Sequence, residues 1–164
     1  MRSQLKISKA QYLLIAGGVL VSNLLGSQAI AAPTIIELVQ VPCQFLGIEQ
    51  DHGFTSQKKA DCEAINEKTA AERLEKSKVM MLKPGEYIFR VSNKNVPYEL
   101  GFWLREKDYN WANPVHKLTK TSISGGGMHM GKTIEYEVTL KPGEYLFSCP
   151  LNTTPDYNLI VSDS

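Results

Sequence analysis

The last strand pair of the chain, residues 140–161 (LKPGEYLFSCPLNTTPDYNLIV), constrains the fold more than any other stretch. Apolar and polar side chains alternate up to Cys149, which is the pattern of a half-buried β-strand. A short loop bounded by two prolines and a return strand follow. The opening residues, LKPGEY, also occur at Leu82–Tyr87, where Pro and Gly suit the central positions of a type II turn. The sequence therefore predicts the same hairpin twice.

The rest of the chain largely continues this β pattern. Residues 34–41 are rich in β-branched side chains and predict a first strand. From Val79 onward, short alternating segments are separated by Gly, Pro and Asn turns, and they include residues 98–104 and 134–140. About seven short strands without a βαβ rhythm predict an all-β, Greek-key antiparallel β-sandwich.

One segment departs from the β pattern. Residues 56–77 are rich in Ala, Lys and Glu, and they predict a single inserted surface α-helix. We expect Ser56 to be the N-cap of this helix. Four residues that recur at the helical period form its expected thin apolar stripe: Ala60, Ala64, Ala71 and Leu74.

Residues 1–31 are predicted to be a signal peptide, and residues 32–164 the one mature domain. Three basic residues precede an apolar run that is short for a membrane span, and Ala29-Ile30-Ala31 forms a small-x-small cleavage site. A retained anchor is the alternative. We expect export to the periplasm or an equivalent compartment, with no stable membrane span after cleavage. Loss of the three basic residues changes the formal net charge from +1 to −2, which leaves no basic footprint for nucleic acid.

The chain contains three cysteines: Cys43, Cys62 and Cys149. Export permits disulfides, and the odd number leaves at least one thiol unpaired. The simplest pairing is Cys43–Cys62, which closes a loop of about 20 residues and stabilises the fold by about 3 kcal/mol in the chain-entropy model. Cys149 is then the free thiol. The alternative interpretation of Cys149 is a small buried hydrophobic residue.

Residues 79–161 resemble the cupredoxin family. The resemblance lies in the strand GEYLFSC, which is followed by a proline and a short loop, and in an earlier turn, Asn93–Tyr98, which is similar to the form N-x-x-x-P-H. In blue-copper members the cysteine ends that strand, one histidine follows the turn, and a second histidine and often a methionine lie in the loop. Here Cys149 matches the cysteine, Tyr98 stands in place of the first histidine, and the loop Pro150–Asp156 has neither histidine nor methionine.

The resemblance therefore implies an incomplete type 1 copper site. Such a site needs two imidazoles and one thiolate, and only Cys149 is present at its matching position. We expect Tyr98 to point into the sandwich, where its hydroxyl would bond either the sulfur of Cys149 or a loop carbonyl.

A second candidate metal site is the segment Met128-His129-Met130. Thioethers favour Cu(I), and alternate residues on an extended segment share one face, so Met128 and Met130 could both meet one ion. His116 or His52 could add a nitrogen donor. The alternative is a flexible loop tip in which these residues have no joint role.

We expect an exported, non-catalytic binding protein that handles copper, or assists a redox system, through a non-standard site. No His or Lys lies near Cys149 in the sequence to activate it as a nucleophile, so we expect no enzyme. The main alternative is a metal-free structural or protein-interaction module of the cell envelope, for which Trp103 and Trp111 would suit an interface. A blue-copper electron carrier is the less favoured alternative. The sequence does not identify the protein partner.

Overall fold

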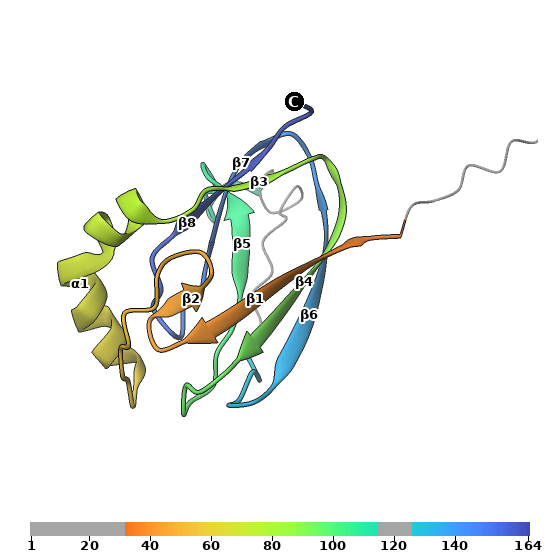
Figure 1. Ribbon diagram of the computed structural model, residues 1–164. Coiled ribbons are helices and arrows are strands. Elements are labelled where there is room, and N and C mark those ends of the chain that lie inside the picture. The colour runs from red at the N-terminus through yellow and green to blue at the C-terminus, as the bar shows by residue number, and fades with distance from the viewer. Residues whose placement is uncertain (1–31, 115–125) are drawn as a thin grey trace, which may run out of the picture. The chain divides into compact units, whose positions relative to one another are not determined.

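The computed structural model describes residues 32–114 and 126–164. These residues form two four-stranded sheets and one helix (Figure 1). The first sheet contains β1 (Thr34–Val41), β2 (Gln44–Leu46), β4 (Gly85–Asn93) and β6 (Thr133–Leu140). The second contains β3 (Met80–Leu82), β5 (Trp103–Glu106), β7 (Gly143–Ser148) and β8 (Tyr157–Val161). The predicted all-β sandwich is confirmed.

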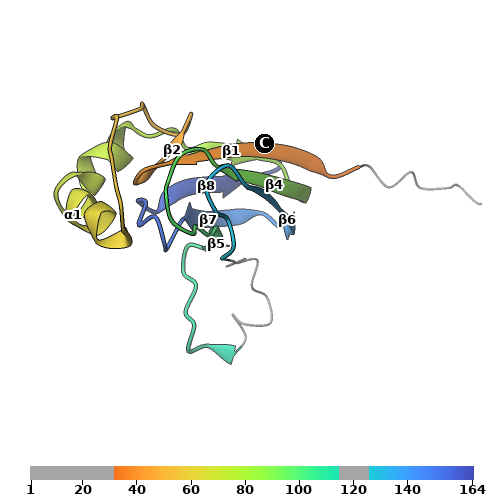
Figure 2. The ribbon, with the colours of Figure 1, turned by 90° about the horizontal axis from the view of Figure 1, so that it is seen from below.

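The strand orders are β2-β1-β4-β6 and β3-β8-β7-β5. Seen from below, β1 and β4 lie in one layer and β8 and β7 in the other (Figure 2). Four of the six strand pairings are antiparallel, as expected, but β1 pairs with β4 and β3 pairs with β8 in parallel. Both sheets are therefore mixed. The alternation of side chains has the same period in parallel and antiparallel strands, so the sequence pattern does not reveal this difference.

The core between the sheets is largely aromatic. Phe102 lies next to Phe45, Phe89, Tyr136 and Phe147, with ring centroids 5.3–6.4 Å apart. The predicted strand 98–104 is only partly a strand, because β5 begins at Trp103. Before β5, an isolated bridge pairs Leu100 with Met128. This bridge brings a segment expected to be a flexible loop into the core.

The two LKPGEY segments adopt the same local structure, but the predicted hairpins are wrong. β3 and β4 lie in different sheets, as do β6 and β7, so each segment leads the chain from one sheet to the other. The hydroxyl of Tyr87 donates to the carbonyl oxygen of Lys83 at 2.7 Å. The hydroxyl of Tyr145 donates to the carbonyl oxygen of Lys141 at 2.9 Å. In both copies the tyrosine closes the turn that begins its own strand.

The predicted helix is confirmed as α1 (Lys59–Lys76), which lies beside β2 and β8 in both ribbon views (Figures 1 and 2). Its start was predicted incorrectly. The carboxylate of Asp61 accepts the backbone N–H groups of Gln57 and Lys58 at 2.8 and 3.1 Å, whereas the hydroxyl of Ser56 pairs with Tyr98.

The apolar stripe expected on this helix is also wrong, because Ala60, Ala64 and Ala71 are exposed and only Leu74 is half-buried. The buried face instead carries Cys62 and Arg73. The helix therefore attaches to the sandwich through a disulfide and a buried ion pair rather than through alanines.

Candidate functional site

Cys149 directly follows β7 and is fully buried. Its sulfur accepts backbone N–H groups of Gly101 and Asn152 at 3.4 and 3.2 Å. Its own N–H donates to the hydroxyl of Thr154 at 2.9 Å. Burial raises the pKa of the Cys149 thiol, and the hydrogen bonds to its sulfur only partly oppose this effect. The thiol is therefore fixed in place and protonated at neutral pH.

Two further buried side chains, Gln40 near the end of β1 and Met128, are linked to the surroundings of this thiol through Gly101. The amide nitrogen of Gln40 donates to the carbonyl oxygen of Gly101 at 2.9 Å and lies 4.0 Å from the sulfur of Met128. The side chain of Gln40 also opposes the effect of burial on the pKa of Cys149. The amide of Gln40 thus lies near the sulfur of Met128 and influences the thiol of Cys149.

Asn152 contacts both this thiol and the disulfide of the chain. Its side-chain oxygen accepts the N–H of Cys43 at 2.9 Å, and its side-chain nitrogen donates to the carbonyl oxygen of Val41 at 2.8 Å. The same oxygen lies 3.5 Å from the sulfur of Cys62. Cys43 and Cys62 form the predicted disulfide, and Cys149 is the free cysteine.

We expected the hydroxyl of Tyr98 to bond the sulfur of Cys149 or a loop carbonyl, but it has other partners. Its hydroxyl lies 3.0 Å from the hydroxyl of Ser56 and 3.5 Å from the sulfur of Cys62. Asn93 fixes this turn, because its side-chain nitrogen donates to the carbonyl oxygens of Val96, Tyr98 and Met128. The turn before Tyr98 thus also holds the Met128 segment against the core.

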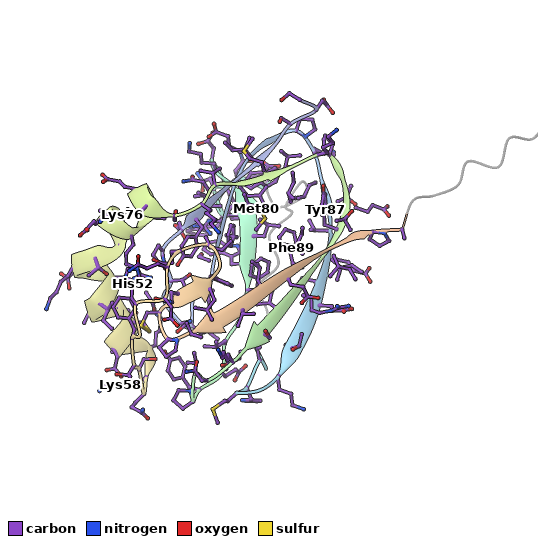
Figure 3. All side chains as sticks on the ribbon, in the orientation of Figure 1. His52, Lys58, Lys76, Met80, Tyr87 and Phe89 are labelled. Atoms are coloured by element: carbon purple, nitrogen blue, oxygen red, sulfur yellow. A yellow bond between two sulfur atoms is a disulfide. The ribbon has the colours of Figure 1, made fainter. Side chains whose placement is uncertain are left out.

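The structure does not bring the Met128-His129-Met130 residues together. Met128 is fully buried, whereas Met130 is 60% exposed and His129 is exposed. His52 lies beside the helix, 3.2 Å from the carboxylate of Glu49 (Figure 3). His116 lies outside the described residues. Of the proposed donors that the structure describes, only Met128 and Cys149 are fully buried in the core between the sheets.

A buried charge cluster is the feature that sequence reasoning missed. Both carboxylate oxygens of Glu49 bind Arg73, at 2.8 and 2.5 Å, and one also accepts the hydroxyl of Tyr157. Burial raises the pKa of Glu49, but the hydrogen bonds from Arg73 and Tyr157 and the positive charge outweigh burial and lower it. The guanidinium of Arg73 also lies over the ring of Phe54, 4.9 Å from its centroid. The Glu49-x-x-His52 spacing was visible in the sequence, but the partner on the helix was not.

The residues around Cys149 do not fit a type 1 copper site. Such a site uses two imidazoles beside the thiolate. Here the side chains near Cys149 are the amides of Gln40 and Asn152, which are hydrogen-bonded to each other. Residues 32–114 and 126–164 contain no group of three or more His, Cys, Asp or Glu side chains placed to hold a metal ion. A thiolate and a thioether do fit the softer ion Cu(I).

No protein-family model and no curated protein sequence matches the chain. Among solved structures, auracyanin B aligns over 80% of this chain and 91% of its own, with 13% identity and a TM-score of 0.49. Auracyanin A, a "blue" copper protein from the green thermophilic photosynthetic bacterium Chloroflexus aurantiacus, aligns over 80% and 100%, with 14% identity and a TM-score of 0.45. A multi-copper oxidase from Pediococcus acidilactici aligns over 94% and 31%, with 13% identity and a TM-score of 0.40.

The chain has a cupredoxin-like fold. Its described residues form two four-stranded mixed sheets, with the free cysteine directly after β7 and the return strand β8 paired with β7. Within the described residues, no helix is long and apolar enough to cross a membrane.

Proposed function

We propose that this chain is an exported, non-catalytic copper-handling protein that binds Cu(I) through the sulfurs of Cys149 and Met128. The observation that carries the proposal is the position of Gln40, whose buried amide nitrogen lies 4.0 Å from the sulfur of Met128. The same nitrogen donates to the carbonyl oxygen of Gly101, the residue whose N–H bonds the sulfur of Cys149. Soft thiolate and thioether donors select Cu(I) over Cu(II). The amides of Gln40 and Asn152, rather than imidazoles, lie near the thiol of Cys149, which would leave Cu(II) without its nitrogen ligands.

A non-catalytic role is supported by the state of Cys149. The thiol is fully buried, and burial raises its pKa, whereas a nucleophilic cysteine needs a lowered pKa and access to substrate. Copper would be carried rather than used in a reaction of the protein itself. Delivery to, or receipt from, a protein partner of the cell envelope follows as the expected role.

Export is supported by the predicted signal peptide at residues 1–31 and by the Cys43–Cys62 disulfide. Disulfides persist in the periplasm and other oxidising compartments. Measuring the mass of the mature protein from an extracytoplasmic fraction tests this part, and a chain that begins at Ala32 is the expected product.

The test of copper handling is Cu(I) competition against a chromophoric chelator, without oxygen and with the disulfide intact. We expect one Cu(I) per wild-type chain, and affinity lower by at least about tenfold in Cys149→Ser and in Met128→Leu. Met130→Leu is the matched control, because Met130 is exposed and should not alter binding. Equal binding by the wild type and Cys149→Ser would exclude this site.

One observation favours the second candidate, a metal-free protein-interaction module. Trp111 is 74% exposed, whereas Trp103 is covered by the guanidinium of Arg105 at 4.0 Å and by the ring of Tyr109. Exposed aromatic side chains are enriched at interfaces. A chain that binds no Cu(I) but loses a partner on Trp111→Ala would support this module instead.

A further inference from the structure

A cavity of about 280 Å³ lies between the segment that precedes α1 and the helix itself. Four side chains from residues 49–54 line one side of it, and four from residues 69–76 of α1 line the other. His52 and Lys76 belong to these two sides (Figure 3). Pockets for drug-sized ligands span about 300–1,000 Å³, so this cavity suits a smaller ligand. Neither Cys149 nor Met128 lines it.

Glu49 and Arg73 are the most buried side chains of the lining, at 2% and 4% exposed. Arg73 binds both carboxylate oxygens of Glu49. It also donates to the side chains of Asn66 and Thr69 and to the carbonyl oxygen of Cys43. A guanidinium group has five N–H donors, and these contacts use all five. Arg73 therefore holds this side of the cavity in place and leaves no N–H for a ligand.

Two stacked rings form another part of the lining, which we call the aromatic wall. The rings of His52 and Phe54 lie 5.2 Å apart between centroids, with 15° between their planes. The Nε2 atom of His52 lies 3.2 Å from the carboxylate of Glu49, and the guanidinium of Arg73 lies 4.9 Å from the centroid of Phe54. Because both rings already have partners, a ligand that packs against them pays little for ordering side chains.

The remaining polar groups of the lining offer both donors and acceptors. Gln50 is exposed and carries an amide. Lys76 and Glu72 form an ion pair at 2.5 Å, with side chains 73% and 72% exposed. The two carboxylates and the two cations of the lining balance in charge. An ionic ligand would therefore lose hydration without meeting an unpaired counter-charge.

We propose that this cavity binds a small neutral saccharide, about the size of one sugar ring. The C–H face of the ring packs against the aromatic wall, since aromatic faces take up apolar surface. The hydroxyl groups, each a donor and an acceptor, bond the side chains of Gln50, Glu72 and Lys76. This binding site goes beyond the copper-handling function and does not rest on it.

The test is a titration of the ¹⁵N-labelled, disulfide-intact protein with glucose and with N-acetylglucosamine, followed by amide chemical shifts. We expect a dissociation constant of about 1–10 mM for at least one of them, as is ordinary for so few ligand atoms. The shifts should be confined to residues 49–54 and 69–76. His52→Ala and Gln50→Ala should each weaken binding by at least about threefold. Lys68→Ala, at an exposed position of α1 outside the lining, is the matched control and should bind as the wild type does.

Charged analogues of the same ring test the ligand class. Glucuronate adds a carboxylate and glucosamine adds an ammonium group, and both should bind more weakly than glucose or N-acetylglucosamine. Tighter binding of either analogue would overturn the proposal of a neutral ligand. Absence of shifts with both neutral sugars, or binding that His52→Ala leaves unchanged in a folded variant, would overturn the site. The amide spectrum reports whether each variant is folded. Cu(I) binding should be the same in His52→Ala and wild type, so failure of this proposal leaves the copper-handling function standing.

Discussion

The side-chain oxygen of Asn152 accepts the backbone N–H of Cys43 at 2.9 Å, although the two residues are 109 positions apart. This bond joins the loop after β7 to the turn between β1 and β2. Asn152 therefore contacts the free thiol of Cys149 through its backbone N–H and the Cys43–Cys62 disulfide through its side chain.

Asn152→Ala should destabilise the protein. The substitution leaves the N–H of Cys43 and the carbonyl oxygen of Val41 buried without partners. Each unsatisfied group costs about 1–3 kcal/mol. Chemical denaturation should show this loss, whereas Asn95→Ala at an exposed turn should change the free energy of unfolding by less than about 0.5 kcal/mol. Equal stability of the two variants would mean that Asn152 does not hold the loop.

Arg73→Ala should lower the free energy of unfolding by about 3–5 kcal/mol, because it leaves the carboxylate of Glu49 buried and unpaired. Lys76→Ala, on the same helix, breaks the exposed pair with Glu72 and should change the free energy of unfolding little, because solvent screens that pair. The two variants are compared by urea denaturation. A similar effect of both would contradict the buried ion pair.

Acid sensitivity should depend on Glu49. Burial raises the folded-state pKa of Glu49. The hydrogen bonds from Arg73 and Tyr157 and the positive charge of Arg73 outweigh burial and lower this pKa below the ordinary 4.5, and His52 lies beside the carboxylate. A carboxyl group with a lowered folded-state pKa stabilises the fold above its unfolded pKa, and this stability is lost as the pH falls through the folded pKa. Wild type should therefore lose more stability than Glu49→Gln between about pH 5 and pH 3. If the free energies of unfolding of wild type and Glu49→Gln fell equally with pH in that range, Glu49 would not be the source of the acid sensitivity.

The Cys149 thiol should react slowly with iodoacetamide at neutral pH. It is fully buried, and burial raises its pKa. We expect modification at least about 100-fold slower than in the unfolded chain, because only the thiolate reacts and only on exposure. The rate is followed by mass spectrometry, with the urea-unfolded protein as control. Rapid reaction of the folded protein would instead indicate an activated cysteine.

The sequence was sufficient to predict the strands and the disulfide because both leave local signals. Tyr87, Phe89 and Val91 are buried as their alternation indicates, and three cysteines allow few pairings. The repeated LKPGEY segment was wrongly interpreted as a hairpin, because Pro and Gly mark a change of direction but do not indicate that the chain passes to the other sheet.

The site itself depends on contacts between distant residues. Gln40 is a buried polar residue on β1, and nothing near it in the sequence indicates that its amide contacts Met128, 88 positions away. The helix was misjudged in a similar way, because alanine periodicity does not reveal that Arg73 has a buried partner in Glu49. Parallel pairing of β1 with β4 likewise depends on the whole topology rather than on any one strand.

X-ray absorption at the copper edge most directly tests the claim that soft sulfur donors, without imidazole, form the site. The measurement uses the disulfide-intact protein loaded with one Cu(I). We predict a first coordination shell of sulfur with no imidazole scattering. The variant Cys149→Ser should lose sulfur from this shell. Histidine ligation, or a spectrum that Cys149→Ser leaves unchanged, would contradict the account.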